Sequence, residues 1–323
     1  MNQISNKQLQ SSSRLVAGND VSFKILEEKL AHHKSQASSL IFPTGYMANL
    51  GSIATLAQKG DLILSDELNH ASIIEACKLS EAKITIYRHN DISDLEKKIT
   101  QKTSRKFIVT EGVFSMDGDY ANLKEISRIA IKNNAMLVLD DAHGDFVLGS
   151  DGKGTGQHFG VEKKIDLYVS SLSKGLGVFG GYVASEKEVI EFLINKSKSF
   201  IYTSALPSFL VDLALKQFIS NREKQRKKLW KNIHFMHHGL KSLGYETSSS
   251  SQIIPIIIGN EKTAVDFRKY LFENGIFAQP IRYPTVKMNT ARVRISITAW
   301  LEKDHLERSL GVLEQAGRKF RIF

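Results

Sequence analysis

The segment IDLYVSSLSKG, residues 165–175, decides the predicted fold. Its first five residues form a short, largely apolar run typical of a buried strand, and hydroxyl groups and Lys174 follow directly. The same order occurs upstream, where the apolar runs 107–110 and 135–139 lead into acidic and imidazole side chains, with a helical pattern between them at 123–133. Short apolar runs that alternate with amphipathic helices are typical of βαβ units. The sequence therefore predicts an α/β fold with a mostly parallel central sheet flanked by helices.

The pattern changes toward the C-terminus, which predicts a second domain. Residues 209–243 are mostly helical and increasingly basic, and strands are expected at 253–258 and 293–297, with helices near 264–273 and 302–315. This combination predicts a smaller α+β domain. We expect a short N-terminal segment over 1–19, a large domain over 20–221 and a small C-terminal domain over 222–323.

The amino-acid composition limits which classes of protein this chain can belong to. A single cysteine, Cys77, excludes an intrachain disulfide framework and favours a reducing, cytoplasmic location. The N-terminus has no apolar stretch of the secretory type, and the longest apolar runs, such as 253–258, are too short to cross a bilayer. The net charge of +10 is explained either by a solvated basic face or by an acidic partner, such as a nucleotide-bearing thioester or an acidic carrier protein. We expect no nucleic-acid or membrane partner.

Chemically active side chains follow the predicted strands. They are Glu111 and Ser115, Asp140 and His143, and Ser171 and Lys174. In an open α/β sheet the carboxyl ends of the strands share one crevice, and ligands bind there. An acid, an imidazole, a hydroxyl and an amine in one pocket suit pyridoxal 5'-phosphate (PLP). Lys174 would form a Schiff base with its aldehyde, and a carboxylate would keep the pyridine nitrogen protonated, so that the ring acts as an electron sink.

A phosphate site is predicted nearer the N-terminus. The segment Thr44–Asn49 follows the apolar run Leu40–Phe42 and opens a helix, and Gly45 allows close approach to the backbone. Free N–H groups at a helix start bind anions. A plain helix N-cap is the alternative interpretation of this motif.

Two other kinds of site compete with this interpretation. Residues 175–180 match the G-x-G-x-x-G pattern of dinucleotide-binding folds, but a strand at 182–184 follows where a helix would be needed. A metal-dependent hydrolase would draw on Asp66, His70, Glu111, Asp140, Asp141, His143 and Asp145. These residues lack close helical ligand spacing, so we expect no metal. Six histidines are predicted to lie on the surface: His32, His33, His89, His234, His237 and His238.

Six segments, spread in order along nearly the whole chain, resemble the α-oxoamine synthases. They are residues 69–72, 110–119, 140–144, 171–175, 201–207 and 290–294. These enzymes are PLP-dependent, have fold type I, and condense an amino acid with an acyl thioester while losing CO2. The resemblance therefore implies the fold of the PLP-dependent transferases, fold type I.

The resemblance also implies roles around the cofactor. Lys174 would hold PLP and remove the α-proton of the bound amino acid, Asp140 would hold the pyridinium nitrogen, and His70 would stack on the ring. His143 would contact the phenolic oxygen. Phosphate-side positions correspond to Gly45, Tyr46 and Ser171, with Thr203 or Ser204 reaching across from the other subunit of a homodimer whose active site lies at the interface.

Substrate-binding roles follow from the same resemblance. Arg294 corresponds to the residue that binds the substrate carboxylate, Arg282 and Thr285 lie in a segment near the acyl group, and Arg14 is also expected on the substrate side. Without the resemblance, the sequence would predict that Arg282 and Arg294 form surface ion pairs on an edge strand. Relatives usually begin with a longer N-terminal region that shapes acyl binding, and this chain starts just before the loop that follows that region.

The choice within the family rests on short segments. Residues 140–144 and 281–286 favour the branch of biotin biosynthesis, which joins L-alanine to pimeloyl-CoA or a pimeloyl carrier protein. Residues 69–74 also resemble the branch of glycine C-acetyltransferases. A PLP-fold subunit that binds but does not catalyse is a further alternative.

Overall fold

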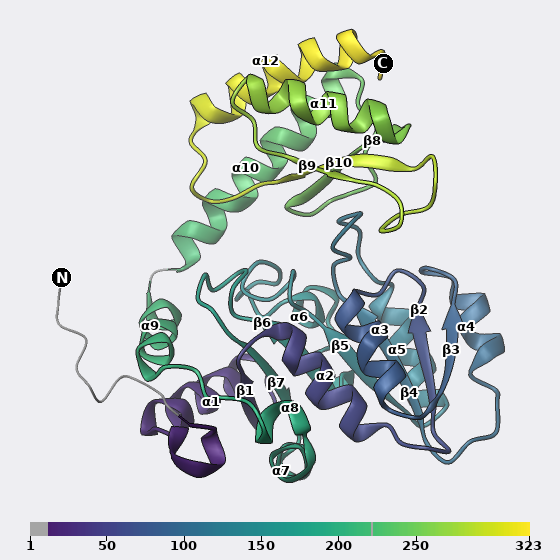
Figure 1. Ribbon diagram of the computed structural model, residues 1–323, viewed down its shortest axis with the longest axis vertical. Coiled ribbons are helices and arrows are strands. Elements are labelled where there is room, and N and C mark those ends of the chain that lie inside the picture. The colour runs from purple at the N-terminus through teal and green to yellow at the C-terminus, as the bar shows by residue number, and fades with distance from the viewer. Residues whose placement is uncertain (1–11, 221) are drawn as a thin grey trace. The chain divides into compact units, whose positions relative to one another are not determined.

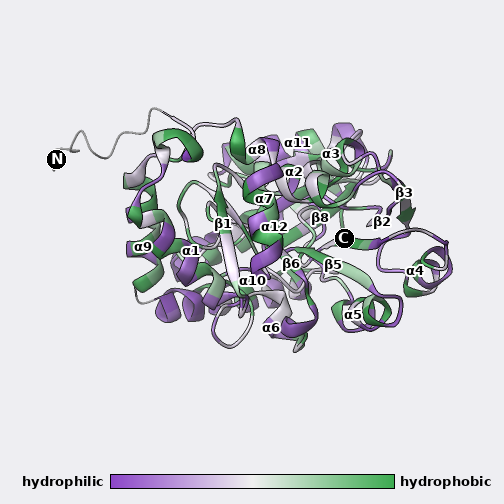
Figure 2. Ribbon diagram, turned by 90° about the horizontal axis from the view of Figure 1, so that it is seen from below, coloured by the Kyte–Doolittle hydropathy of each residue, from purple (hydrophilic) through white to green (hydrophobic). Residues whose placement is uncertain are grey.

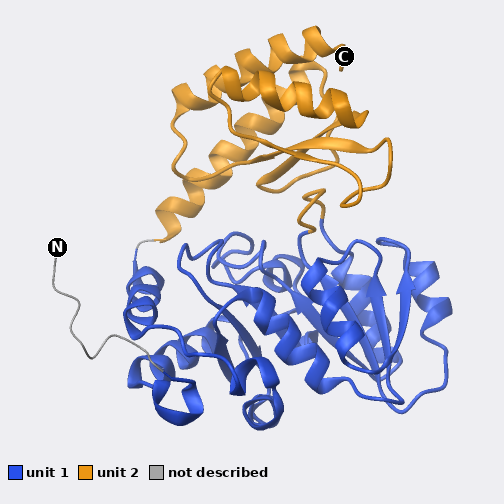
Figure 3. Ribbon diagram, viewed as in Figure 1, with its two compact units in different colours: residues 1–113, 120–220 blue, residues 114–119, 221–323 orange. Residues whose placement is uncertain are grey.

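The computed structural model describes residues 12–220 and 222–323 of the chain, which divides into two compact units (Figure 1). One comprises residues 1–113 and 120–220, and the other residues 114–119 and 221–323 (Figure 3). Most of the N-terminal segment expected over 1–19, and the expected boundary residue 221, lie outside the described residues. Segment 114–119 groups with the C-terminal unit, although it follows a strand of the first unit.

The first unit is built on a seven-stranded sheet with the order β1-β7-β6-β5-β4-β2-β3. Its strands are β1 (Ser38–Phe42), β2 (Leu62–Asp66), β3 (Lys83–Tyr87), β4 (Lys106–Glu111), β5 (Ala135–Asp140), β6 (Leu167–Ser171) and β7 (Gly181–Ser185). Only β7 runs antiparallel to its neighbours β1 and β6, while β2 to β6 pair in parallel. The prediction of a mostly parallel sheet is confirmed.

Helices connect and cover these strands. They are α1 (Val21–His33), α2 (Gly45–Leu56), α3 (Ala71–Leu79), α4 (Ile92–Lys98), α5 (Leu123–Lys132), α6 (Thr155–Phe159), α7 (Lys187–Lys196), α8 (Lys198–Ile201) and α9 (Ser208–Ile219). In α5, Leu123, Ile126, Ile129 and Ala130 are buried, because a spacing of three and four residues places them on one face. The inner strands β2, β6 and β7 are buried along their whole length, as is typical of a sheet covered on both faces.

The C-terminal unit has a three-stranded antiparallel sheet with the order β8-β10-β9. Its elements are α10 (Arg222–Leu243), β8 (Ile253–Gly259), α11 (Glu261–Glu273), β9 (Gln279–Ile281), β10 (Ala291–Ser296) and α12 (Lys303–Phe320). Apolar residues alternate with polar ones along α12 (Figure 2), and its buried Leu306 and Leu313 share one core cluster with Ile254 and Val293 of the sheet. The predicted α+β organisation is confirmed. Within the described residues, no helix has the length and apolar character needed to cross a membrane.

Candidate active site

The candidate site lies at the carboxyl edge of the seven-stranded sheet. The strands β1, β2, β4, β5 and β6 run in the same direction, so their carboxyl ends meet at this edge. The predicted residues of the first unit follow these strands: Gly45 and Tyr46 after β1, His70 after β2, Glu111 at the end of β4, Asp140 and His143 at β5, and Ser171 and Lys174 at β6. Glu111 and Asp140 are direct neighbours in the pairing of β4 with β5.

Asp140 is a buried carboxylate held by two donors. Its Oδ1 accepts a hydrogen bond from the backbone N–H of Ala142 at 3.0 Å, and its Oδ2 accepts one from Asn49 Nδ2 at 2.6 Å. Asn49 comes from α2 and is itself buried. Two donors on separate elements fix the orientation of both carboxylate oxygens, as expected for a group that must hold a positive charge in one place.

His70 caps the N-terminus of α3. Its Nδ1 accepts a hydrogen bond from the backbone N–H of Ser72 at 3.2 Å, and its ring meets Tyr46 edge to face, with ring centroids 6.5 Å apart. Burial lowers the pKa of His70; the negative charge of Asp140 raises it, and the positive charge of Lys174 lowers it further. The net shift is downward, so the imidazole is neutral at neutral pH. That both charges act on this ring places Asp140, Lys174 and His70 in one electrostatic environment.

The turn that carries His70 is tied to the neighbouring strand by Asn69. The Asn69 amide donates to the Val109 carbonyl at 2.8 Å and to Ser65 Oγ at 2.9 Å, and its Oδ1 accepts from the backbone N–H of Glu111 at 3.1 Å. Because these bonds link the ends of β2 and β4, they position His70 relative to Glu111 and the rest of the edge.

The N-terminus of α2 fits tightly against the ends of β6 and β7. Thr44 caps the helix by accepting from the Met47 N–H at 3.1 Å. A Cβ on Gly181 would lie 2.3 Å from the Gly45 nitrogen, and a Cβ on Gly45 would lie 3.0 Å from the Cβ of Ser171. Glycine at 45 and 181 therefore lets the helix start approach the ends of β6 and β7 closely. We call this surface of Gly45, Ser171 and Gly181 the cradle, and the polarity of a helix N-terminus suits an anion there.

A buried ionic cluster joins His33 and Lys34, at the end of α1, to Asp141 and Asp145, which follow Asp140 in the chain. Lys34 Nζ is 2.8 Å from carboxylate oxygens of both Asp141 and Asp145, and His33 Nε2 is 2.9 Å from Asp145. Tyr182 and Ser170 also donate hydrogen bonds to Asp145. The prediction that His33 lies on the surface is wrong: its ring is buried and stacks on Phe146, with centroids 4.5 Å apart.

Lys34 offsets the repulsion between the two carboxylates of this cluster. Burial and the nearby charge of Asp145 still raise the pKa of Asp141. Burial disfavours a charged Lys34, but Asp141 and Asp145 outweigh it and raise the pKa of Lys34. Burial likewise acts against the charged form of Asp145, yet Lys34 and His33 hold the pKa of Asp145 well below its usual range. The cluster fixes the 141–145 loop that follows Asp140 and carries His143, which is half-buried.

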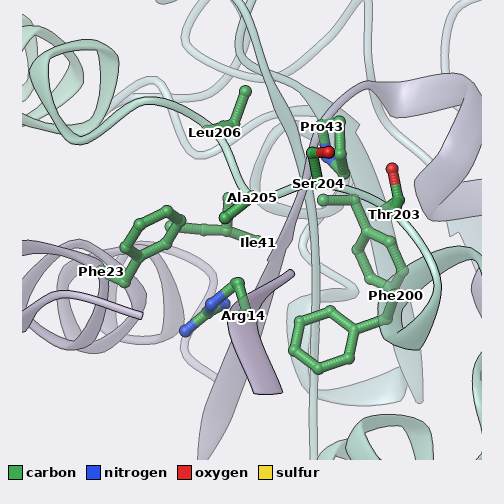
Figure 4. A pocket seen from close by; sticks show the side chains of 10 residues that line it. Arg14, Phe23, Ile41, Pro43, Phe200, Thr203, Ser204, Ala205 and Leu206 are labelled. Carbon is green, nitrogen blue, oxygen red and sulfur yellow. The ribbon is translucent and has the colours of Figure 1, made fainter. Parts of the chain in front are cut away.

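Arg14, Thr203 and Ser204 line a small pocket near α1 (Figure 4). Arg14 lies in a short π-helix, Arg14–Gly18, where its guanidinium packs 4.4 Å from the centre of the Phe23 ring and pairs with Glu27. These contacts occupy the guanidinium, and the expected place of Arg14 on the substrate side stays a prediction. Thr203 Oγ1 lies 4.0 Å from Met47 Sδ, and Ser204 is exposed.

The remaining predicted residues belong to the C-terminal unit. Ser115 is buried in the 114–119 segment. Arg282 and Thr285 are exposed in the turn after β9, where the Thr285 N–H donates to the Arg282 carbonyl at 2.9 Å. Arg294 lies on β10, opposite Pro255 and Gln279. Since β10 is the central strand of its sheet, the interpretation of Arg294 as an edge-strand residue is wrong.

The competing sites gain no support from the structure. The glycine run leads directly into β7, with Gly177 at φ +78°, so it forms a turn between antiparallel strands and does not open a dinucleotide-binding helix. Residues 12–220 and 222–323 contain no group of three or more His, Cys, Asp or Glu side chains that could hold a metal ion.

Sequence reasoning assigned no role to Asn49, Ser72 or Lys34. Asn49 and Ser72 are 2% and 1% exposed, and each carries a polar group on a helix whose buried residues are mostly apolar or small. A polar side chain on the buried face of a predicted helix requires a hydrogen-bonding partner. That requirement could have identified Asn49 and Ser72 as residues with a structural or functional role. Lys34 gave none, because a lysine after two histidines at a helix end is typical of an exposed terminus.

Comparison with known proteins gives consistent matches along the chain. The sequence matches the aminotransferase class I and II family over residues 4–313. It is 44% identical over 315 residues to an 8-amino-7-oxononanoate synthase from Thermoanaerobacter pseudethanolicus, covering 96% of this chain and 80% of that relative. It is 41% identical to the Citrifermentans bemidjiense enzyme of the same name, covering 96% and 82%.

Solved structures give the same family. A serine palmitoyltransferase from S. paucimobilis with bound PLP superposes with a TM-score of 0.93 at 32% identity, covering 97% of this chain and 81% of that one. The 8-amino-7-oxononanoate synthase from Francisella tularensis superposes with a TM-score of 0.83 at 30% identity, covering 97% and 90%. These matches confirm fold type I. The chain belongs to the aminotransferase class I and II family and, within it, to the PLP-dependent α-oxoamine synthases.

Proposed function

We propose that this protein condenses L-alanine with a pimeloyl thioester, carried by CoA or a carrier protein, to give 8-amino-7-oxononanoate, CO2 and a free thiol in biotin biosynthesis. The observation that carries the chemistry is that Asp140, His70 and Lys174 end or follow parallel strands at the carboxyl edge of the sheet, where the charges of Asp140 and Lys174 both act on the His70 ring. The choice of substrates is supported by 44% identity over 96% of the chain to an 8-amino-7-oxononanoate synthase.

The first unit offers PLP a matching set of groups. The cradle at the start of α2, with Ser171 beside Gly45, suits the phosphate, and the buried Asp140 carboxylate suits the pyridinium nitrogen. The His70 ring, flanked by Tyr46, would lie against the cofactor, and His143 would contact its phenolic oxygen. Thus Lys174, Asp140, His70 and Ser171 are the residues that would hold the cofactor.

When bound, PLP supplies an electron-poor ring that stabilises negative charge at the substrate Cα. In the proposed reaction the Lys174 amine takes the proton from that carbon, and Asp140 keeps the ring nitrogen protonated. A bond forms between Cα and the acyl carbonyl carbon, the thioester C–S bond breaks with release of thiolate, and the substrate carboxylate leaves as CO2. Lys174 then returns the proton to Cα. Arg294 would bind the amino-acid carboxylate through its guanidinium, with Arg282 and Thr285 near the acyl group.

A matrix of substrates tests the proposed specificity. L-Alanine, glycine and L-serine would each be combined with acetyl-, succinyl-, pimeloyl- and palmitoyl-CoA and with a pimeloyl carrier protein, and thiol and CO2 release would be measured together. We expect the highest kcat/KM with L-alanine and a pimeloyl donor. Fastest turnover of glycine with acetyl-CoA would assign the chain to the glycine C-acetyltransferases instead. No turnover with any pair, despite bound PLP, would identify a non-catalytic subunit.

We also propose that the protein is a homodimer in which Thr203 or Ser204 of one subunit reaches the phosphate side of the other. Support comes from two exposed apolar side chains. Tyr202, which precedes Thr203, is 82% exposed, and Val16, in the π-helix whose Gly18 packs against Ala205, is 80% exposed. Sedimentation equilibrium should give twice the chain mass of 36.2 kDa. A mass of one chain at micromolar concentration would contradict the dimer.

Gly181→Ala should weaken both the fold and the cofactor site. The added Cβ would lie 2.3 Å from the Gly45 nitrogen and 2.4 Å from the Thr44 carbonyl carbon, so the start of α2 must move. We expect a loss of about 1–3 kcal/mol in unfolding free energy and weaker PLP binding. Urea unfolding and equilibrium titration with PLP measure the two effects.

Gly311→Ala is the matched control for this prediction. Gly311 lies in α12, and a Cβ there would meet nothing within 4 Å, so alanine should be neutral or stabilise by roughly 0.5–1 kcal/mol. Wild-type PLP affinity in Gly181→Ala would show that the cradle beside α2 does not hold the phosphate.

A further inference from the structure

Two buried side chains without an assigned role connect Asp140 to His70. Asn49 Nδ2 lies 2.6 Å from Asp140 Oδ2 and 2.9 Å from Ser72 Oγ, and Ser72 Oγ lies 2.8 Å from His70 Nδ1. These contacts form a continuous chain of hydrogen bonds from Asp140 through Asn49 and Ser72 to His70. All of them lie within the first unit and join the end of β5, the second turn of α2 and the start of α3.

The direction of each bond in this chain follows from the chemistry of its groups. A carboxylate can only accept, so the end of the Asn49 amide that faces Asp140 must be the NH2 group. The same NH2 donates its second hydrogen to Ser72 Oγ. The Ser72 hydroxyl, which accepts from Asn49, is then free to donate its own hydrogen to His70 Nδ1.

The backbone of Ser72 gives one independent observation that agrees with this direction. The backbone N–H of Ser72 also points at His70 Nδ1, at 3.2 Å, and a backbone N–H can only donate. Asn49 Oδ1 is buried and accepts no hydrogen bond from the described residues, yet a rotated amide would place that oxygen against the Asp140 carboxylate. The two acceptors, Asp140 Oδ2 and Ser72 Oγ, therefore hold the Asn49 amide in this orientation, although Asn49 Oδ1 accepts no hydrogen bond from the described residues.

We propose that Asn49 and Ser72 are positioning residues that couple the negative charge of Asp140 to the proton position on His70. The charge of Asp140 orients the Asn49 amide, the amide orients the Ser72 hydroxyl, and the hydroxyl together with the Ser72 N–H keeps Nδ1 of His70 unprotonated. His70 is thereby a neutral ring with its proton on Nε2.

The functional consequence depends on the proposed PLP site, whereas the tautomer is a property of the chain itself. A neutral His70 places no positive charge beside the pyridinium that Asp140 would hold, so both groups can serve the same cofactor. The charged side chains that act on His70 are Asp140 and Lys174, and the Tyr46 ring packs against it. A cationic His70 would interact with the Asp140 carboxylate as well, and so would weaken the stabilisation that this carboxylate gives to a pyridinium.

The experiment is nitrogen NMR of the protein labelled with 15N-histidine, in the PLP-loaded and the PLP-free state, with the His70 signals assigned by their loss in His70→Gln. Wild type should show the Nε2–H tautomer in both states. Ser72→Ala should shift the tautomer ratio toward Nδ1–H by roughly fivefold to tenfold, the factor that one lost hydrogen bond represents. Ser72→Thr, which keeps the hydroxyl, should restore the wild-type ratio.

Asn49→Leu should shift the ratio in the same direction and also weaken PLP binding, since Asp140 loses a donor. Ser52→Ala is the matched control: Ser52 lies on the same helix and is fully buried, but its hydroxyl donates to the Ala48 carbonyl at 2.6 Å, away from His70. That variant should keep the wild-type ratio. An Nδ1–H tautomer in wild type, or an unchanged ratio in Ser72→Ala, would overturn the proposal.

Failure of this inference is distinguishable from failure of the proposed function. The spectra of the PLP-free protein decide the tautomer even if no cofactor binds or no substrate turns over. A correct tautomer in a protein that does not bind PLP would support the hydrogen-bond chain and contradict the cofactor assignment.

Discussion

Lys174→Ala is expected to lower kcat by roughly a hundredfold to ten-thousandfold with the best substrate pair. Lys174 lies directly after β6, and its positive charge acts on His70. The variant loses the amine that would hold the cofactor and the base that would move the proton at the substrate Cα. Steady-state thiol release measures the effect.

PLP should still bind to Lys174→Ala without a covalent bond. The cradle at α2 and the Asp140 carboxylate are untouched by the substitution, so equilibrium titration should find a weaker but measurable affinity. Lys187→Ala is a suitable control, because Lys187 is a surface residue whose side chain is 73% exposed and pairs only loosely with Glu191, at 3.6 Å. Wild-type turnover in Lys174→Ala would remove Lys174 from the reaction.

Lys34→Met is expected to be the most destabilising substitution outside the active site. Lys34 is 1% exposed and lies 2.8 Å from both Asp141 and Asp145, so its loss leaves two buried carboxylates without their shared cation. Breaking a buried ion pair by removing one partner costs about 3–5 kcal/mol. Urea unfolding at neutral pH measures the difference in unfolding free energy.

Two further variants identify the cause of that loss. Lys78→Met removes a lysine from an exposed pair with Glu75 and should leave stability close to wild type. Lys34→Met combined with Asp141→Leu should recover part of the lost stability, because one of the stranded charges is then gone. If the double variant is no more stable than Lys34→Met alone, the loss comes from packing and not from unpaired charge.

The same cluster predicts how stability depends on pH. The pKa of Asp145 is lower in the folded protein than in the unfolded chain, so its contribution is complete above the unfolded value, about 4, and is lost as the pH falls below it. Asp145 should therefore cost wild type unfolding free energy as the pH falls below about 4, and the raised pKa of Asp141 opposes part of that loss. Asp145→Asn should show a smaller acid-dependent loss, and an equal loss would assign the acid sensitivity to other groups.

The parts of the fold that could be predicted are those with a strong local pattern. Strands β4, β5 and β6 are buried on both faces and read as apolar runs, and α5 shows a clear helical spacing. The grouping of segment 114–119 with the C-terminal unit could not be predicted. It depends on contacts distant in sequence, such as the ion pair of Asp117 with Arg292 and the hydrogen bond from Ser249 to the Gly118 carbonyl.

The same distinction applies to the candidate site. Asp140, Lys174 and Glu111 were predictable, because each ends or follows a strand and parallel strands bring their carboxyl ends together. Asn49 contacts a residue 91 positions away, and Lys34 one 107 positions away, so neither partner is visible in the local pattern. His33 was misplaced for the same reason, since its partner Asp145 is 112 residues distant.

The most direct test of the central claim is to locate the bound cofactor. The PLP-loaded protein would be reduced with borohydride and digested, and the phosphopyridoxyl group would be found by mass spectrometry of the peptides. We predict a single modified residue, Lys174. Modification of a different lysine, or a protein that carries no cofactor after incubation with PLP, would contradict the assignment.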